Sequence, residues 1–338
     1  MTCDRDNAAE AMDPELDALL GADSPVGPED RAGAARGGGA GARSPLFWKL
    51  ALATIALTWG FSFFMMKDIL GLLPTYRLLA VRFDVAALLM LILFRKRVAA
   101  HLNRRNIVVG AGIGFVLWIA YAAQTLGLAQ TTAGKNAFLT GTYCVLVPFA
   151  SYLLMRERLT RYNVGAAFMC LAGIGLVALD SMRANTGDVL TLAGAAFFAL
   201  QISLIAKFGR DLDVNVITFW MFLAVGILST GSSCLFERDA WLPPSQWTPG
   251  VVGTLAFLSV CCTCLALLVQ NVALAHVPSS TGSLLLSLES PSGVFFSVVM
   301  TGEALTPRLL AGFALIFLSI VLSETHFDFL RGRRKALA

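Results

Sequence analysis

The apolar residues of this chain fall into ten blocks of about 20 residues, and this length restricts the possible folds more than any other sequence feature. A helix of about 20 residues rises about 30 Å, which matches the hydrocarbon core of a bilayer. Barrel strands need only about 10 residues, so we predict helices. The blocks lie at about 46–66, 72–94, 106–126, 133–155, 162–180, 188–207, 214–236, 249–271, 279–300 and 307–326.

Composition agrees with a membrane protein. Hydrophobic residues make up 57% of the 338 residues and charged residues only 14%, and a soluble domain could not bury so much apolar surface. Lys and Arg at the ends of the blocks explain the net charge of +4 without a nucleic-acid partner. We therefore predict an all-α integral membrane protein with ten transmembrane helices and the lipid bilayer as its first partner.

Basic residues are distributed unequally between alternate loops. One set of loops holds Arg95, Lys96, Arg97, Arg104, Arg105, Arg156, Arg158, Arg161, Lys207 and Arg210. The other set holds Lys67, Lys135, Arg183, Arg238 and Arg308. Because cytoplasmic loops are enriched in Lys and Arg, the pattern predicts that both termini are cytoplasmic. We expect the protein in the inner (plasma) membrane.

Residues 124–160 return in diverged form at 270–306, with a constant offset of 146 residues. The matches are Gln124/Gln270, Leu128/Leu274, Ala129/Ala275, Leu139/Leu285, Phe149/Phe295, Ser151/Ser297, Glu157/Glu303, Leu159/Leu305 and Thr160/Thr306. A looser alignment at offset 140 includes Lys67/Lys207. Between the two copies the chain crosses the membrane five times, an odd number, so the second copy has the opposite orientation. We therefore predict two inverted five-helix repeats, at 46–180 and 188–326, with the functional site between them.

The two ends of the chain differ from the blocks. Residues 1–44 are acidic and then glycine-rich, and they contain too few apolar residues to order themselves, so we expect a disordered cytoplasmic tail. This segment lacks the apolar core of a signal peptide. A partner-binding role for it stays open. Residues 327–338 are predicted to form a basic cytoplasmic tail.

Glu289 is the strongest candidate for a functional residue, because a carboxylate inside a span is costly and marks function by default. It is the eleventh residue of the block 279–300, near the membrane midplane, and the following Pro291 favours a helix break. Low-dielectric burial disfavours its charged form, which makes Glu289 a candidate proton-coupling carboxylate. The alternative is a structural carboxylate paired with Arg or capped by Ser287 or Ser290.

Arg82 is also the eleventh residue of its block, 72–94. Its planar guanidinium is expected to balance Glu289 or to hold a substrate carboxylate. Arg77 and Asp84 lie on one helix face, so the alternative is that these two residues simply satisfy each other as an ion pair. Lys135 begins the fourth block near the outer face, where it either contributes to a cavity or reaches water along its flexible stem.

Uncharged residues complete the candidate site. Tyr143 occupies the repeat position of Glu289, and the paired Gln124 and Gln270 either line a symmetric cavity or hold helices together. Tyr121 and Thr125 extend the polar patch of Gln124. The further candidates, for which helix packing is the alternative, are Asn271, Trp59, Ser62 and Gln201.

The sequence offers no cofactor, metal or enzyme signature. Cys261 and Cys264 have the C-x-x-C spacing, but no second pair or nearby His completes a metal site, and helix packing of small residues is the preferred interpretation. H-E-x-x-H, the Ser-His-Asp order and a phosphate-binding glycine loop are all missing. We therefore predict that the chain is not an enzyme and does not use ATP.

In these features the chain resembles the EamA-type transporters of the drug/metabolite transporter superfamily. The resemblance is carried by WGFSFFMMKDIL (59–70), PTYRLLAVRFDVAALLML (74–91), GLAQTTAGKNAFLTGTYCVLVPF (127–149), LAHVPSSTGSLLLSLESPSGVFFSVVMTGEALT (274–306) and the ERLT and EALT helix ends. It implies an inner-membrane carrier, often an exporter of amino acids or related metabolites, with a cavity between its halves. Asp84 departs from the apolar residue usual at its position.

The leading hypothesis is a secondary carrier that exports a small, amino-acid-like metabolite by alternating access, with proton coupling through Glu289. One alternative is an importer or an exchanger of small organic anions that uses Arg82 and Lys135. An alternative of another class is a membrane-embedded enzyme that acts on a lipid-linked substrate, which would need a catalytic cluster at one interface. Both a monomer and a homodimer are compatible with the sequence.

Overall fold

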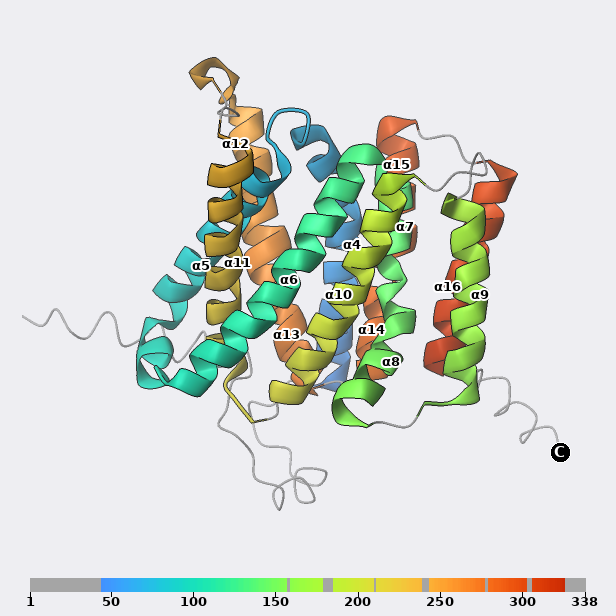
Figure 1. The fold of residues 1–338 in the computed structure, drawn as a ribbon, viewed down its shortest axis with the longest axis horizontal. Coiled ribbons are helices and arrows are strands. Elements are labelled where there is room, and N and C mark those ends of the chain that lie inside the picture. Colours follow the sequence, from blue (N-terminus) through green and yellow to red (C-terminus); the bar gives the residue numbers. More distant parts are fainter. Residues whose placement is uncertain are drawn as a thin grey trace, which may run out of the picture.

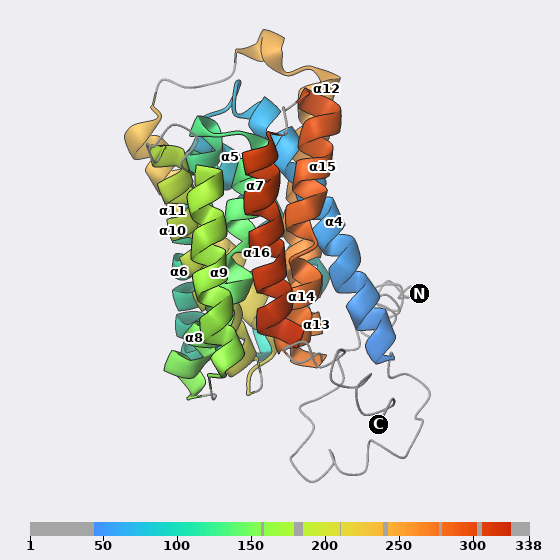
Figure 2. The ribbon, with the colours of Figure 1, turned by 90° about the vertical axis from the view of Figure 1, so that its right-hand side faces the viewer.

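The computed structural model describes residues 44–156, 159–178, 185–209, 211–238, 243–276, 279–302 and 306–325. Its long helices lie roughly side by side as one bundle (Figure 1 and Figure 2). In chain order the helical elements are α4 (Pro45–Ile69), α5 (Thr75–Ala100), α6 (Arg104–Gln130), α7 (Ala133–Gly141), α8 (Tyr143–Met155), α9 (Arg161–Ala178), α10 (Thr186–Phe208), α11 (Val214–Phe236), η1 (Pro244–Gln246), α12 (Pro249–Ala256), η2 (Phe257–Leu265), α13 (Ala266–His276), α14 (Ser279–Leu286), α15 (Glu289–Thr301) and α16 (Pro307–Thr325). The predicted tails, Glu157, Glu303 and His326 lie outside the described residues.

The all-helical prediction is confirmed for the described ranges. Six helical stretches there are long and apolar enough to cross a membrane: Leu46–Ile69, Arg104–Gln130, Ala133–Met155, Thr186–Phe208, Val214–Phe236 and Pro249–Leu274. Helix α5 is as long as these, but Arg77, Arg82, Asp84 and the basic residues near its end interrupt its apolar surface. The structure therefore supports a membrane protein, and charge within one helix separates α5 from the simple apolar spans.

Side-chain caps explain why several helices begin where they do. Ser44, Asn103, Thr132 and Asp213 each accept a hydrogen bond from a backbone N–H in the first turn of α4, α6, α7 and α11. Such caps satisfy donors that have no partner within the helix. Helix α5 follows Pro74, and a carboxylate from outside the helix, that of Glu237, accepts the N–H groups of its second and third residues at 2.8 and 2.9 Å.

Two helices are interrupted at positions 146 residues apart. The α7–α8 break falls at Thr142 and the α14–α15 break includes Leu288, and these two residues have similar backbone angles (φ −62° and ψ −15°, against φ −60° and ψ −16°). The helices that follow end on Arg156 and Gly302, which both adopt a left-handed conformation (φ 56° and 68°). The sequence repeat is thus matched in the local backbone. The break expected beside Glu289 is present.

Glycines allow several helices to approach one another closely, as expected for packing in membranes. A Cβ added at Gly110 or Gly114 of α6 would lie only 3.0 or 2.6 Å from a carbonyl oxygen of α11. Gly173 of α9 packs in the same way against α16, the helix beside it in Figure 2. Gly165 of α9 makes no such approach, because nothing lies within 4 Å of its added Cβ.

Candidate functional site

A cavity lies among the helices, next to both helix breaks. It is lined by Trp59, Ser62, Phe63, Met66, Arg82, Tyr121, Gln124, Thr140, Tyr143, Phe198, Gln201, Ile202, Leu267, Gln270 and Glu289. These residues come from both halves of the chain, and charged, amide, hydroxyl and aromatic groups face one space.

Seven of the nine candidate residues predicted from the sequence lie on this cavity wall. They are Glu289, Arg82, Tyr143, Gln124, Gln270, Trp59 and Gln201. Lys135 and Asn271 are absent from the wall. The assignment of a transport role to the seven stays a prediction, but their convergence on one cavity shows that they are neighbours in the fold.

Glu289 begins α15 at the helix break and is only 4% exposed. The hydroxyl of Tyr143 donates a hydrogen bond to its Oε2 at 3.3 Å. Tyr143 begins α8 at the equivalent break, so residues at equivalent repeat positions bond to each other. Within the described part of the chain Glu289 forms no salt bridge, and the expected pairing with Arg82 is not present. The carboxyl is therefore held by a neutral donor.

Arg82 is 1% exposed and is among the largest fully buried side chains in the described part of the chain. Its Nε donates to Thr263 Oγ1 at 2.9 Å, and its Nη1 lies 2.8 Å from Met66 Sδ. The guanidinium carbon lies 5.3 Å from the ring centre of Tyr121, a cation–π distance. No carboxylate of the described residues lies within salt-bridge distance of Arg82.

The alternative that Arg77 and Asp84 satisfy each other is wrong. Asp84 accepts a hydrogen bond from Thr230 of α11 at 2.9 Å. Arg77 donates instead to Ser233 Oγ at 3.0 Å and to the backbone oxygen of Glu237 at 3.1 Å. Both side chains therefore tie α5 to α11, since the neighbouring helix offers closer partners than the same face of α5.

Lys135 neither reaches the cavity nor stands free in water. Its Nζ forms an ion pair with Asp188 Oδ2 at 3.0 Å, and Thr131 donates to the other carboxylate oxygen at 3.0 Å. Asp188 is fully buried. The pair links α7 to α10. Asp188 is not among the residues predicted from the sequence, although a lone acid at the start of an apolar span is a visible signal.

Asn271 binds a neighbouring helix rather than the cavity, because its amide nitrogen donates to Thr218 Oγ1 of α11 at 3.0 Å. Gln124 differs. Its Nε2 donates to Thr140 at 3.2 Å, whereas its buried Oε1 has no hydrogen-bond partner among the described residues. A buried unpaired acceptor is costly, so Gln124 offers a contact to a donor that enters the cavity.

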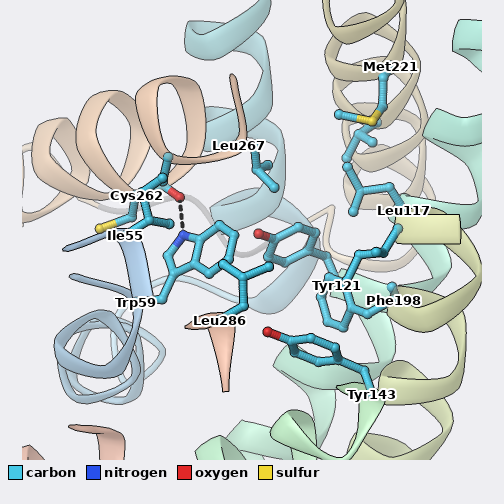
Figure 3. Packing of buried hydrophobic residues seen from close by; sticks show 14 of the residues in the cluster. Ile55, Trp59, Leu117, Tyr121, Tyr143, Phe198, Met221, Cys262, Leu267 and Leu286 are labelled. Atoms are coloured by element: carbon cyan, nitrogen blue, oxygen red, sulfur yellow. Dashed lines mark hydrogen bonds between the residues drawn. The ribbon is translucent and has the colours of Figure 1, made fainter. Parts of the chain in front are cut away.

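Aromatic rings form one side of the cavity. Figure 3 shows the indole N–H of Trp59 bonded to the backbone oxygen of Cys262, at 2.7 Å, and the hydroxyls of Tyr121 and Tyr143 directed toward the same region as the Trp59 ring. Phe198 packs edge-on against Tyr121, with ring centres 5.0 Å apart. The ring faces are apolar and the tyrosine hydroxyls are polar, so this side of the cavity is amphipathic.

Much of the apolar wall could not be predicted from the sequence. Ser62, one of the weaker sequence candidates, and Tyr121, predicted to extend the polar patch of Gln124, both line the cavity, as does Thr140, which no sequence pattern indicated. The apolar members are Phe63, Met66, Phe198, Ile202 and Leu267. In a chain that is 57% hydrophobic, no signal in a single sequence separates an apolar residue that lines a cavity from one that packs between helices.

The bundle and its cavity define a class: a helical membrane protein with a cavity lined by charged, amide and aromatic residues from both halves of the chain. The model of the EamA-like transporter family matches residues 46–179 and 185–325. The chain therefore belongs to the EamA-like transporter family.

Known proteins agree with this membership. An "Uncharacterized transporter" of Archaeoglobus fulgidus is 30% identical over 286 residues, 84% of this chain and 88% of that protein. "Uncharacterized transporter YvbV" of Bacillus subtilis is 26% identical over 285 residues, 82% of this chain and 91% of that protein. A solved crystal structure with 19% identity covers 85% of this chain and 99% of its own, with a TM-score of 0.63, which shows a shared fold.

Proposed function

We propose that this protein is a secondary active transporter that exports a small metabolite across the inner membrane by alternating access. The observation that carries the proposal is the cavity itself, where Arg82 and Glu289, two buried ionisable groups that form no salt bridge within the described residues, face one space beside both helix breaks. Buried groups of this kind are expensive in a membrane protein and mark substrate or ion pathways. Broken helices at a repeat interface are typical of transporter sites.

The proposed topology has ten crossings and two inverted repeats, at 46–180 and 188–326, with both termini in the cytoplasm. Each of α7–α8, α12–η2–α13 and α14–α15 then forms one crossing. Two hydrogen bonds support a two-fold relation between the repeats. Ser290 Oγ donates to the Ala137 oxygen at 3.4 Å, and Cys144 Sγ donates to the Ser283 oxygen at 3.0 Å. Residue 290 is the repeat equivalent of residue 144, and residue 283 is the repeat equivalent of residue 137. Each of the two bonds therefore joins the repeat equivalents of the residues in the other bond.

The chemistry of the cavity favours an amino-acid-like substrate. Arg82 suits a carboxylate, Glu289 and the free oxygen of Gln124 suit an amino group, and the aromatic wall suits an apolar side chain. The anion-exchanger alternative is weaker, because Lys135, one of its two cations, is already paired with Asp188. The relatives named above are called transporters, which supports transport over an enzymatic role.

Proton coupling is assigned to Glu289 in this proposal. Its carboxyl can bind and release a proton, and the other ionisable groups on the cavity wall are Tyr121, Tyr143 and Arg82. In proteoliposomes that contain the purified protein, a pH gradient is expected to drive transport in wild type. Glu289→Gln keeps the size and polarity but cannot carry a proton, so stimulation by the gradient should disappear. Undiminished gradient-driven transport in this variant would end the coupling role.

An untargeted comparison of metabolites tests the transport function and identifies the substrate class in the same measurement. Cells that overproduce the protein are expected to accumulate one class of small metabolite in the medium, and cells that lack it should retain that class. Overproduced Arg82→Ala protein, at matched membrane abundance, is the control. Identical metabolite profiles for wild type and this variant would contradict a role of the cavity in transport.

A further inference from the structure

The helix α12–η2–α13 contains a nine-residue π-helical segment, Phe257–Leu265. A π-helix is rare, and a π-bulge inside an α-helix frequently occurs at a functional site. The side chain of Thr263 also spans five residues, because its hydroxyl donates to the backbone oxygen of Leu258 at 2.8 Å. The sequence predicted an uninterrupted span here, so this local geometry is new information from the structure.

Two consecutive residues of the π segment each hold one cavity residue from another helix. The backbone oxygen of Cys262 accepts the indole N–H of Trp59 from α4 at 2.7 Å (Figure 3). Thr263 Oγ1 accepts the Nε–H of Arg82 from α5 at 2.9 Å. The segment therefore fixes both an aromatic wall residue and the buried cation of the cavity.

The cysteine-rich sequence of this segment now has an explanation. Ser259, Cys262, Thr263 and Cys264 are all at most 1% exposed, and the segment packs against both α4 and α5. Small side chains at these positions allow that packing, which agrees with the interpretation preferred for the C-x-x-C spacing. Among the described residues no cluster of His, Cys, Asp or Glu could hold a metal ion.

The contacts of Arg82 leave its charge without an anionic partner. Thr263 binds Nε, Met66 contacts Nη1 and the Tyr121 ring lies beside the guanidinium, but no carboxylate of the described residues pairs with Nη2. A buried cation balanced only by neutral groups is costly, and here it lines the cavity. An anionic group that entered the cavity would balance it with a charge-assisted hydrogen bond.

We propose that the π segment determines substrate specificity: Thr263 is a positioning residue that holds Arg82 so that Nη2 receives the carboxylate of the substrate, beside the Trp59 ring. The inference rests on the proposed transport function and adds to it the substrate's carboxylate and the element that selects for it. Thr263 does not itself contact the substrate. Its hydroxyl acts through Arg82.

Arginine labelling tests the positioning step without any substrate. Purified full-length protein is treated with 4-hydroxyphenylglyoxal, and modification of Arg82 is followed by peptide mass spectrometry. Thr263→Val keeps the side-chain shape but loses the hydroxyl, so Arg82 should react about tenfold faster than in wild type. Thr263→Ser restores the hydroxyl, and Cys261→Ala changes the same segment without touching Arg82. Both should react at the wild-type rate.

An unchanged labelling rate in Thr263→Val would overturn the positioning role. If that variant does not yield monodisperse protein, Thr263→Ala replaces it with the same expectation. Equal acceleration in Cys261→Ala would also contradict the proposal, because it would indicate general loosening of the segment. None of these outcomes depends on transport activity.

Transport kinetics test the specificity step, with leucine and leucinamide as matched probes in proteoliposomes. Thr263→Val is expected to raise KM for leucine about tenfold with kcat nearly unchanged, and to leave leucinamide unaffected. Equal losses for both probes would contradict selection of a carboxylate. If wild type moves neither probe, the amino-acid-like substrate class of the proposed function fails, and the labelling result still decides whether Thr263 positions Arg82.

Discussion

Arg82 and Glu289 share a cavity but are satisfied by neutral groups rather than by each other. Buried charges in proteins are normally paired, because desolvation of an isolated charge is expensive. Arg82 uses a hydroxyl, a thioether and a ring, and Glu289 uses the hydroxyl of Tyr143. We propose that the charged substrate of the transporter uses the remaining hydrogen-bonding capacity of both residues.

The ion pair between Lys135 and Asp188 gives a stability prediction. Asp188 is fully buried, so Lys135→Met should leave an uncompensated carboxylate and destabilise the fold by about 3–5 kcal/mol. The double variant Lys135→Met/Asp188→Leu should recover most of that loss. Unfolding in detergent, followed by circular dichroism, measures both. A double variant less stable than Lys135→Met alone would contradict this account.

Arg156 gives a second prediction at the residue scale. It has a left-handed backbone (φ 56°) at the position where its repeat partner is Gly302 (φ 68°). Such a conformation costs a non-glycine residue roughly 1–2 kcal/mol. Arg156→Gly should therefore raise the free energy of unfolding by about 1 kcal/mol, while Arg156→Lys, which keeps the charge and the strain, should have no effect. Lower stability in Arg156→Gly would show that other contacts of Arg156 dominate.

At the scale of helices, close packing joins α4, α7 and α15. An added Cβ at Gly60 would lie 2.7 Å from the backbone nitrogen of Gly293, and one at Gly293 would collide with Ala137. Ser290 of α15 also bonds to the Ala137 oxygen. These contacts lie on one side of the two helix breaks, so we infer that they close one end of the cavity in this conformation.

Gly293→Val tests this closure, because the larger side chain should separate α15 from α7. Overpacking of this kind typically costs about 1–3 kcal/mol. We expect normal membrane insertion, lower thermal stability and transport reduced by about tenfold or more, measured in proteoliposomes. Gly112→Val is the matched control, since nothing lies within 4 Å of a Cβ at that position. Equal transport by the two variants would contradict the proposed closure.

At the scale of the whole molecule, the inverted topology makes a prediction about sidedness. Single cysteines introduced as Glu157→Cys and Glu303→Cys, in a background without native cysteines, should react with a membrane-impermeant maleimide from opposite sides. The reason is that five crossings separate the two repeat-equivalent positions in the proposed topology. Labelling of both from the same side would refute the inverted arrangement.

Sequence patterns alone predicted the helical membrane class, the approximate helix ranges and seven of the residues that line the cavity. Bilayer thickness fixes span length, and buried polar groups stand out in an apolar chain. The repeat also predicted equivalent positions such as Tyr143 and Glu289. The sequence could not predict which of these residues meet, because a partner such as Asp188 for Lys135 or Thr263 for Arg82 depends on how distant helices pack. The π segment was likewise invisible, since its spacing differs from an α-helix only in local geometry.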